Sequence, residues 1–240
     1  MISAVFHALI YDPLYNGLVY LVGLLPSHDV GIAVIVLTIV VRIVLYPLSR
    51  RAVETQMAMK KIAPDVEKIK EKYKDKREEQ AKAIFALYKE KGVHPFASFG
   101  LLLAQLPILF ALYWVFASGG LPAIRPELLY TFVTAPLSVN MEFLGFLDMS
   151  GHSLILGIIA ALTQFVYTRL SMGPREKTPP RDGAPSFSGE LARSFDLQAR
   201  YFLPATFIII SYFVPNAAMI YLITSNTFMI GQEFFAGRRF

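Results

Sequence analysis

Long apolar runs, separated by charged or proline-containing segments, dominate the pattern of this chain. A helix needs about 20 predominantly apolar residues, with a range of roughly 17 to 25, to cross the hydrocarbon core of a bilayer. The pattern predicts five membrane-spanning helices, over residues 29–49, 95–117, 153–172, 201–215 and 216–236. The last two are short and meet at a Pro215-Asn216 turn, so a single broken, re-entrant helix is the alternative.

The first 28 residues are also apolar, but Asp12, Pro13 and Asn16 interrupt them and leave a run too short to span. We predict an extracytoplasmic interfacial segment with a helix at residues 4–25, because its Phe and Tyr residues suit the headgroup level. Residues 1–16 contain no Lys or Arg, so no cleavable signal peptide is expected.

Residues 50–94 break the apolar pattern and predict a cytoplasmic helical hairpin. Pro64 is expected to begin one of its helices, and Gly92 is expected to end the other. The segment carries 13 basic and eight acidic residues. This charge pattern fits either a solvated surface without a partner or a surface that contacts anionic lipid or ribosomal RNA.

Basic residues also set the orientation, because cytoplasmic loops carry the excess of Lys and Arg. Residues 50–91 hold 13 of the 23 basic residues, whereas Arg125 is the one basic residue of the predicted extracytoplasmic side. The N-terminus is therefore expected outside and the C-terminus inside. The remaining segments become an extracytoplasmic loop at 118–152, a cytoplasmic loop at 173–200 and a cytoplasmic tail at 237–240. The predicted fold is an all-α, polytopic membrane protein.

Composition supports a membrane protein and argues against an enzyme. Apolar residues make up 55% of the chain, charged residues 17%, and cysteine is absent; the mean hydropathy is +0.48. The chain contains no P-loop, HExxH or G-x-S-x-G motif, and its four histidines have no ligand spacing. We expect no catalytic residue, no metal site and no cofactor.

Arg42 is the most informative residue, because it lies within the first predicted span. At 1.5 Å per residue, it is roughly 9 Å inside the cytoplasmic end of that helix. A central arginine costs about 2.5 to 3.5 kcal/mol on insertion scales, so its charge is expected to find an acidic partner or water. Glu233 is the one acidic residue within the apolar runs of these spans, which cover residues 31–48, 96–116, 153–172, 201–214 and 217–235. It is expected to reach the interface or Arg238 and Arg239. Arg42 therefore predicts a water-filled groove that receives a ligand with oxygen atoms.

Other polar residues of the spans are candidates to line this groove. Thr38 lies one helical turn before Arg42, and Tyr221 and Ser225 are one turn apart in the last span. For each residue alone, a hydrogen bond that holds two helices together is the alternative. The predicted groove residues are Arg42, Thr38, Gln105, Gln164, Tyr221, Ser225 and Asn226.

Several of these motifs occur in one order that resembles the YidC family of membrane protein insertases. They are the run from Thr38 through Arg42 to Leu48, the lysine-rich hairpin with Leu87-Tyr88-Lys89, the stretch Gln105–Tyr113, and Phe213-Val-Pro215 followed by Tyr221 and Ser225-Asn226. The resemblance covers nearly all of residues 30–236 and is to a short form without a large extracytoplasmic domain. It implies a five-helix core around a hydrophilic groove that is open to the cytoplasm and to lipid and closed outside.

The function implied is that of an insertase and chaperone in the bacterial plasma membrane. Nascent membrane proteins would enter the groove at Arg42 from the cytoplasm and release their apolar segments sideways into the lipid bilayer. The ribosome and the Sec translocon stay open as further partners, DNA is not expected as a partner, and the unit is expected to be a monomer. The alternatives are an ion or anion channel or transporter component that uses Arg42 for selectivity, and a structural adaptor for other membrane complexes.

Overall fold

The computed structural model describes residues 2–73, 76–93, 97–117, 120–172 and 197–237. The described residues are mainly helical, as the all-α prediction requires. They also include one two-stranded hairpin. It divides into two compact units, one formed by residues 1–43 with 106–240 and the other by residues 44–105. The predicted loop at 173–200 and the tail at 237–240 lie largely outside the described residues.

The larger unit begins with a continuous N-terminal helix. It consists of α1 (Ile2–Phe6), one π-helical turn η1 (His7–Tyr11) and α2 (Asp12–Leu24). The helix predicted at residues 4–25 is confirmed, and it continues through Asp12 and Pro13, because Pro13 lies in the first turn of α2 and the N–H of Asp12 bonds to the carbonyl of His7. The predicted position of this helix at the membrane interface stays a prediction.

The other helices of this unit lie within the predicted spans, although α9 covers only eight of the 15 residues of the span predicted at 201–215. They are α3 (Val30–Val44), α6 (Ala97–Ala117), α7 (Leu154–Met172), α9 (Leu203–Ile210) and α10 (Asn216–Phe235), of which α3 and α6 extend past the unit boundary. A π-helical turn η3 (Gln198–Phe202) leads into α9, and a 3-10 turn η2 (Pro126–Leu128) follows α6. α9 and α10 are separate helices joined by a turn ending at Pro215, and the choice between two short spans and one broken, re-entrant segment stays a prediction.

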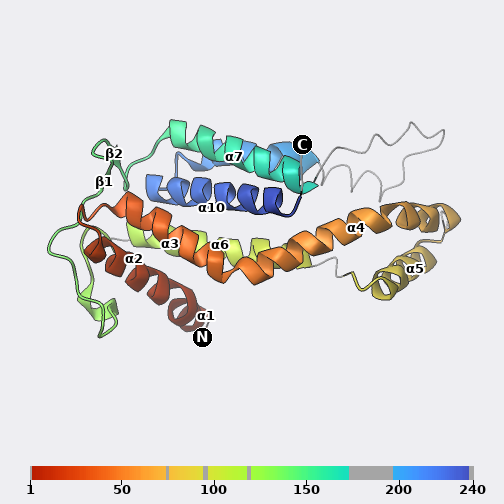
Figure 1. The fold of residues 1–240 in the computed structure, drawn as a ribbon, viewed down its shortest axis with the longest axis horizontal. Helices are drawn as coiled ribbons and strands as arrows, with labels where there is room; N and C mark the ends of the chain where they lie inside the picture. The colour runs from red at the N-terminus through yellow and green to blue at the C-terminus, as the bar shows by residue number, and fades with distance from the viewer. Residues whose placement is uncertain (1, 74–75, 94–96, 118–119, 173–196, 238–240) are drawn as a thin grey trace. The chain divides into compact units, whose positions relative to one another are not determined.

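Packing in this unit centres on α7, which contacts both α9 and α10 (Figure 1). Gly157 of α7 allows the close approach of α9, since a Cβ there would lie 2.3 Å from Ser211 Oγ. Ala217, Ala218 and Met219 at the start of α10 have no exposed surface. Small residues at such contacts are typical of helices that associate within a membrane, where close backbone packing replaces the hydrophobic effect.

Large apolar side chains lie on the outside of the same helices. On α7 the exposed ones are Leu154, Ile155, Ile158, Ile159 and Leu162, and α3 exposes Ile39, Val40, Ile43 and Val44. Continuous apolar surface of this kind is unusual on a soluble monomer. Among the described residues, length and composition qualify α7 as a membrane span, with a second if Val30–Val44 and Tyr46–Met59 are counted as one broken span. The count of five spans stays a prediction.

The smaller unit contains the predicted hairpin, formed by α4 (Tyr46–Lys72) and α5 (Arg77–Glu90). The expected start of a helix at Pro64 is wrong, because Pro64 lies inside the 27-residue α4. The stop at Gly92 is confirmed, since α5 ends two residues earlier and Gly92 adopts a φ of 63°. Exposed ion pairs such as Arg50–Glu54 at 2.9 Å lie on its surface. Burial raises the pKa of Tyr88 above its usual range.

Candidate functional site

Arg42 lies near the end of α3 with only 4% of its surface exposed. Its Nε donates a hydrogen bond of 2.7 Å to Oγ of Ser225 on α10, and its Nη2 donates to the same oxygen. The structure thus brings together two of the predicted groove residues from opposite ends of the sequence. A hydroxyl is a neutral acceptor, so these bonds leave the positive charge of the guanidinium in place.

Two tyrosines also lie near this guanidinium. Tyr221 precedes Ser225 by one turn of α10 and is 1% exposed, and Tyr167 comes from α7. Both lie close enough to Arg42 to interact with its charge. Tyr167 was not predicted, although its spacing of three residues from the candidate Gln164 places both on one face of α7.

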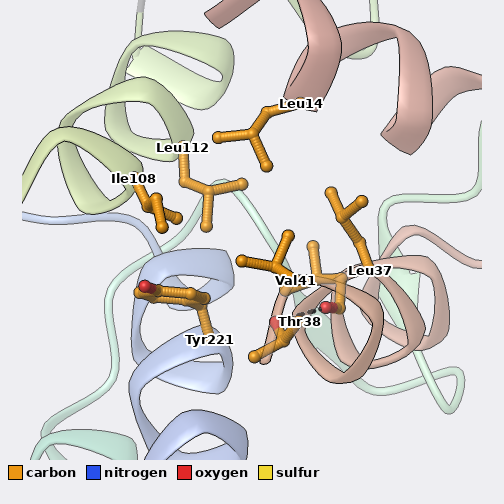
Figure 2. A pocket seen from close by; sticks show the side chains of 8 residues that line it. Leu14, Leu37, Thr38, Val41, Ile108, Leu112 and Tyr221 are labelled. Carbon is orange, nitrogen blue, oxygen red and sulfur yellow. Dashed lines mark hydrogen bonds between the residues drawn. The ribbon is translucent and has the colours of Figure 1, made fainter. Parts of the chain in front are cut away.

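A small cavity lies next to this cluster (Figure 2). Thr38 and Tyr221 line its wall together with six apolar side chains from α2, α3 and α6, and its empty volume is about 180 Å³. The hydroxyl of Thr38 donates a 2.6 Å hydrogen bond to the carbonyl of Val34 in its own helix. The cavity is mainly apolar, and no sphere the size of a water molecule fits inside it. The apolar residues of its lining are Leu14, Val34, Leu37, Val41, Ile108 and Leu112.

The remaining predicted residues lie elsewhere. Asn226 donates a 3.3 Å hydrogen bond to Oγ1 of Thr163 and so connects α10 with α7. Gln164 donates at 3.2 Å to Thr168 within α7. Gln105 belongs to the smaller unit and is not placed against the other candidates. The bond of Asn226 fits the alternative considered from the sequence, in which a polar residue holds two helices together, whereas the bond of Gln164 lies within one helix.

Glu233 differs from its expected environment. It was expected to reach the interface or the terminal arginines, but its side chain is only 1% exposed within the fold. Arg238 and Arg239 lie outside the described residues. Ser225 and Glu233 are eight residues apart on α10, which corresponds to about 12 Å along the helix axis.

Comparison with known proteins identifies the family of this chain. A family described as 60Kd inner membrane protein matches residues 23–240. The chain belongs to the 60Kd inner membrane protein family. The YidC resemblance read from Arg42 and the motifs around it is therefore confirmed.

Several relatives of this chain carry the name Membrane protein insertase YidC. The relative from Anaeromyxobacter dehalogenans (strain 2CP-C) is 28% identical over 227 residues, covering 91% of this chain and 35% of the relative. That from Neisseria gonorrhoeae (strain NCCP11945) is 29% identical over 210 residues, covering 87% and 33%. That from Clostridium tetani is 28% identical over 207 residues, covering 86% and 81%. The chain thus spans about a third of the length of several relatives and most of another.

One feature of this chain was not predicted from the sequence, namely the hydrogen bonding that orders residues 120–152 over one end of the helices. From α2, Tyr15 donates to the carbonyl of Gly120 at 3.0 Å and accepts from N–H of Arg125 at 2.8 Å. Asn16 donates to the carbonyl of Leu128 at 2.8 Å and accepts from N–H of Tyr130 at 2.6 Å. The signal in the sequence was a Tyr-Asn pair within an apolar segment, in which we interpreted the tyrosine as suited to the headgroup level and the asparagine as an interruption of the apolar run.

The same loop of this family member is also fixed to α3 and α10. Asp29 caps α3 by accepting from N–H of Ile32 at 3.0 Å, and its second oxygen accepts from N–H of Leu144 at 3.1 Å. Asn216, at the start of α10, donates at 2.7 Å to the carbonyl of Asp148. The loop therefore closes the end of the helices that was predicted to face outside.

Proposed function

We propose that this protein inserts other membrane proteins into the bacterial plasma membrane, with Arg42 as the residue that receives the polar part of the client. One observation carries the proposal: a member of a family whose relatives are named insertases holds a guanidinium buried between α3 and α10 against a neutral hydroxyl. The groove residues proposed within the same unit are Thr38, Gln164, Tyr221, Ser225 and Asn226, and Gln105 stays a prediction from the sequence.

Electrostatics gives Arg42 its role. A charge held in a poorly hydrated site is costly, and a carboxylate of the client would form a charge-assisted, bidentate pair with the guanidinium. Such a carboxylate competes with Ser225 for Nε and Nη2, because both nitrogens point at one hydroxyl oxygen. Acidic residues in the polar tail of a client are therefore the preferred ligands of this site.

The client needs more room than the cavity beside Tyr221 provides. That cavity has no volume accessible to a sphere the size of a water molecule, whereas an ordinary ligand pocket offers a few hundred Å³. A groove able to hold a polypeptide requires α3 and α10 to separate, and the contact between Arg42 and Ser225 is one that must open. Competition by a client carboxylate for the guanidinium favours this opening.

The proposed arrangement in the membrane has five spans, with the N-terminus and residues 118–152 outside and the hairpin of α4 and α5 in the cytoplasm. The ordered loop over residues 120–152 supports a closed outer end, because it is hydrogen-bonded to α2, α3 and α10. A client would therefore enter from the cytoplasm and leave sideways. The bilayer and nascent membrane proteins are the proposed partners, and the proposed active form is a monomer.

The energy for insertion comes from the client. Burial of apolar surface contributes about 25 cal/mol per Å². Movement of an acidic tail out of a negative interior contributes about 2.3 kcal/mol per charge per 100 mV. Arg42 therefore acts by lowering the barrier for the polar tail, and no covalent chemistry is involved.

Insertion assays in vesicles reconstituted with purified protein test the role of Arg42. Arg42→Glu and Arg42→Ala should abolish insertion of a client with an acidic tail, whereas Arg42→Lys should retain part of it because the charge survives. Arg169→Glu, on the exposed face of α7, is the matched control and should stay active. Full activity of Arg42→Glu would disprove the role of this residue.

A conducting pathway, the main alternative considered from the sequence, is not favoured. Six of the eight residues that line the cavity beside Arg42 are apolar, whereas ion pathways are lined by polar or charged groups. Ion-flux measurements on the same vesicles provide the check, since a channel would conduct without a client.

A further inference from the structure

Two large apolar side chains project from the tip of the small hairpin in the outer loop. The hairpin pairs β1 (Glu142–Phe143) with β2 (Leu147–Asp148), and residues 144–146 form its turn. Leu144 is 62% exposed and Phe146 is 77% exposed. Exposed Leu and Phe on the turn of a two-stranded hairpin make no contribution to a protein core, so the turn is a candidate contact surface.

The backbone of this turn holds the two side chains in place at a conformational cost. Leu144 adopts a φ of 54° and Gly145 a φ of 79°. The left-handed region is unfavourable for a residue with a Cβ, and strain of this kind is often found at functional positions. The N–H of Leu144 bonds to Asp29 at 3.1 Å, which stabilises the strained residue.

The hairpin has a fixed height along α3. Phe143 packs directly on Gly31, where an added Cβ would lie 2.4 Å from the ring. Asn140 also pairs with the backbone on both sides of Asp29, since its carbonyl accepts from Val30 at 3.0 Å and its N–H donates to His28 at 3.0 Å. These contacts hold the turn level with the first residues of α3. In the proposed topology, this level is the outer boundary between lipid and water.

Two further observations favour lipid as the occupant of this surface. The exposed apolar face of α7 begins at Leu154 and Ile155, a few residues after β2, so apolar surface recurs at this end of the helices. The loop itself carries one basic and three acidic residues over 120–152, which gives no attraction to anionic headgroups. Contact with lipid would therefore depend on apolar insertion and not on charge.

We infer that Leu144 and Phe146 anchor the outer loop in the headgroup and acyl boundary of the outer leaflet. This inference rests on the proposed topology, in which α3 begins at the outer surface. The two side chains hold the outer loop, residues 120–152, against the bilayer. This is the end of the protein at which clients do not enter.

Single cysteines test the inference directly, because the chain has none of its own. Leu144→Cys and Phe146→Cys are labelled with an environment-sensitive fluorophore in vesicles of phosphatidylcholine. Glu127→Cys, on the exposed turn η2, is the matched control from the same loop. We expect blue-shifted emission at 144 and 146, quenching by nitroxide-labelled lipid and protection from iodide, with the opposite pattern at 127. Adding anionic lipid or salt should change neither result.

Iodide quenching at 144 and 146 equal to that at 127 would overturn the inference. Protection from both quenchers that increases with protein density would also overturn it, because a second copy of the chain would then cover the turn. Failure of a membrane-impermeant thiol reagent to label Glu127→Cys from outside would instead reject the proposed topology and the inference together.

Discussion

Ser225 accepts hydrogen bonds from two nitrogens of the same buried guanidinium, so its hydroxyl should matter more than that of an ordinary serine. A hydrogen bond to a charged group contributes more than a neutral one, and burial raises the cost of losing it. Ser225→Ala should lower the free energy of unfolding by about 1 to 3 kcal/mol. Thr227→Ala is the control, because that exposed hydroxyl bonds only to the carbonyl of Ile223 in its own helix. If Ser225→Ala and Thr227→Ala lowered the free energy of unfolding in detergent equally, the hydrogen bonds to Arg42 would contribute no more than an ordinary one.

Tyr15 should make the protein sensitive to alkaline pH. Burial raises the pKa of its phenol above the ordinary value of 10.0, although the hydrogen bond from the N–H of Arg125 acts in the opposite direction. A raised pKa in the folded state means that the folded protein keeps a proton that the unfolded chain loses. The stabilisation is therefore complete below about pH 10 and is lost as the pH rises through the folded-state pKa.

The measurement compares unfolding from pH 8 to 11 for the native protein and for Tyr15→Phe. The variant should be less stable at pH 8, because it lacks the hydroxyl that binds Gly120 and Arg125, and the difference should shrink as the pH rises. Tyr20→Phe, an exposed residue of the same helix, should follow the native curve. A constant difference for Tyr15→Phe across this range would contradict the assignment.

At the scale of helices, the length of an apolar run predicted the bounds of the long helices well. The predicted span at 153–172 became Leu154–Met172, and the one at 216–236 became Asn216–Phe235. Prolines were harder to interpret, because proline is accepted within or at the start of a helix when the local geometry adjusts. Pro64 lies inside α4, and Pro13 follows a π-helical turn that keeps α1 and α2 in one helix. Periodicity alone does not contain this information.

The contact between α7 and α9 depends on Gly157. A Cβ at this position would lie 2.3 Å from Ser211 Oγ and 2.6 Å from Ser211 Cβ, so Gly157→Ala should destabilise the protein by about 1 to 3 kcal/mol. Gly231→Ala is a matched control within α10, where an added Cβ meets nothing within 4 Å. That change should be neutral or stabilising by up to about 1 kcal/mol, since alanine favours helix. Gly157→Ala with Ser211→Gly should recover part of the loss, and no recovery would place the strain elsewhere.

For the whole molecule, the sequence predicted individual residues of the candidate site better than it predicted which residues contact one another. The cost of an arginine within an apolar run identified Arg42, and its hydrogen bonds to Ser225 join two predicted residues 183 positions apart. The pairing of Asn226 with Thr163 and the loop contacts of Tyr15, Asn16 and Asp29 needed the fold, because hydrogen bonds between distant segments leave no periodic signal. The role of α2 in the cavity beside Thr38 was invisible for the same reason.

The number of spans is the property of the whole chain that most needs a direct measurement, and α6 is the decisive helix. Lys82 of α5 and Glu127 of η2 are both exposed and are separated by one predicted span, so they should face opposite sides of the membrane. With 13 basic residues between positions 50 and 91, the side of Lys82 should be the cytoplasm. A membrane-impermeant thiol reagent should therefore label Glu127→Cys in intact spheroplasts and Lys82→Cys only in inverted vesicles.

A third position extends the test to α7. Gln198, at the exposed start of η3, should behave like Lys82, because one further span separates it from Glu127. Labelling of Lys82→Cys and Glu127→Cys from one side would show that α6 does not cross the membrane. Labelling of Gln198→Cys from the outside would exclude α7, the one unbroken described helix that length and composition qualify as a span, and would change the orientation of Arg42 and Ser225 as well.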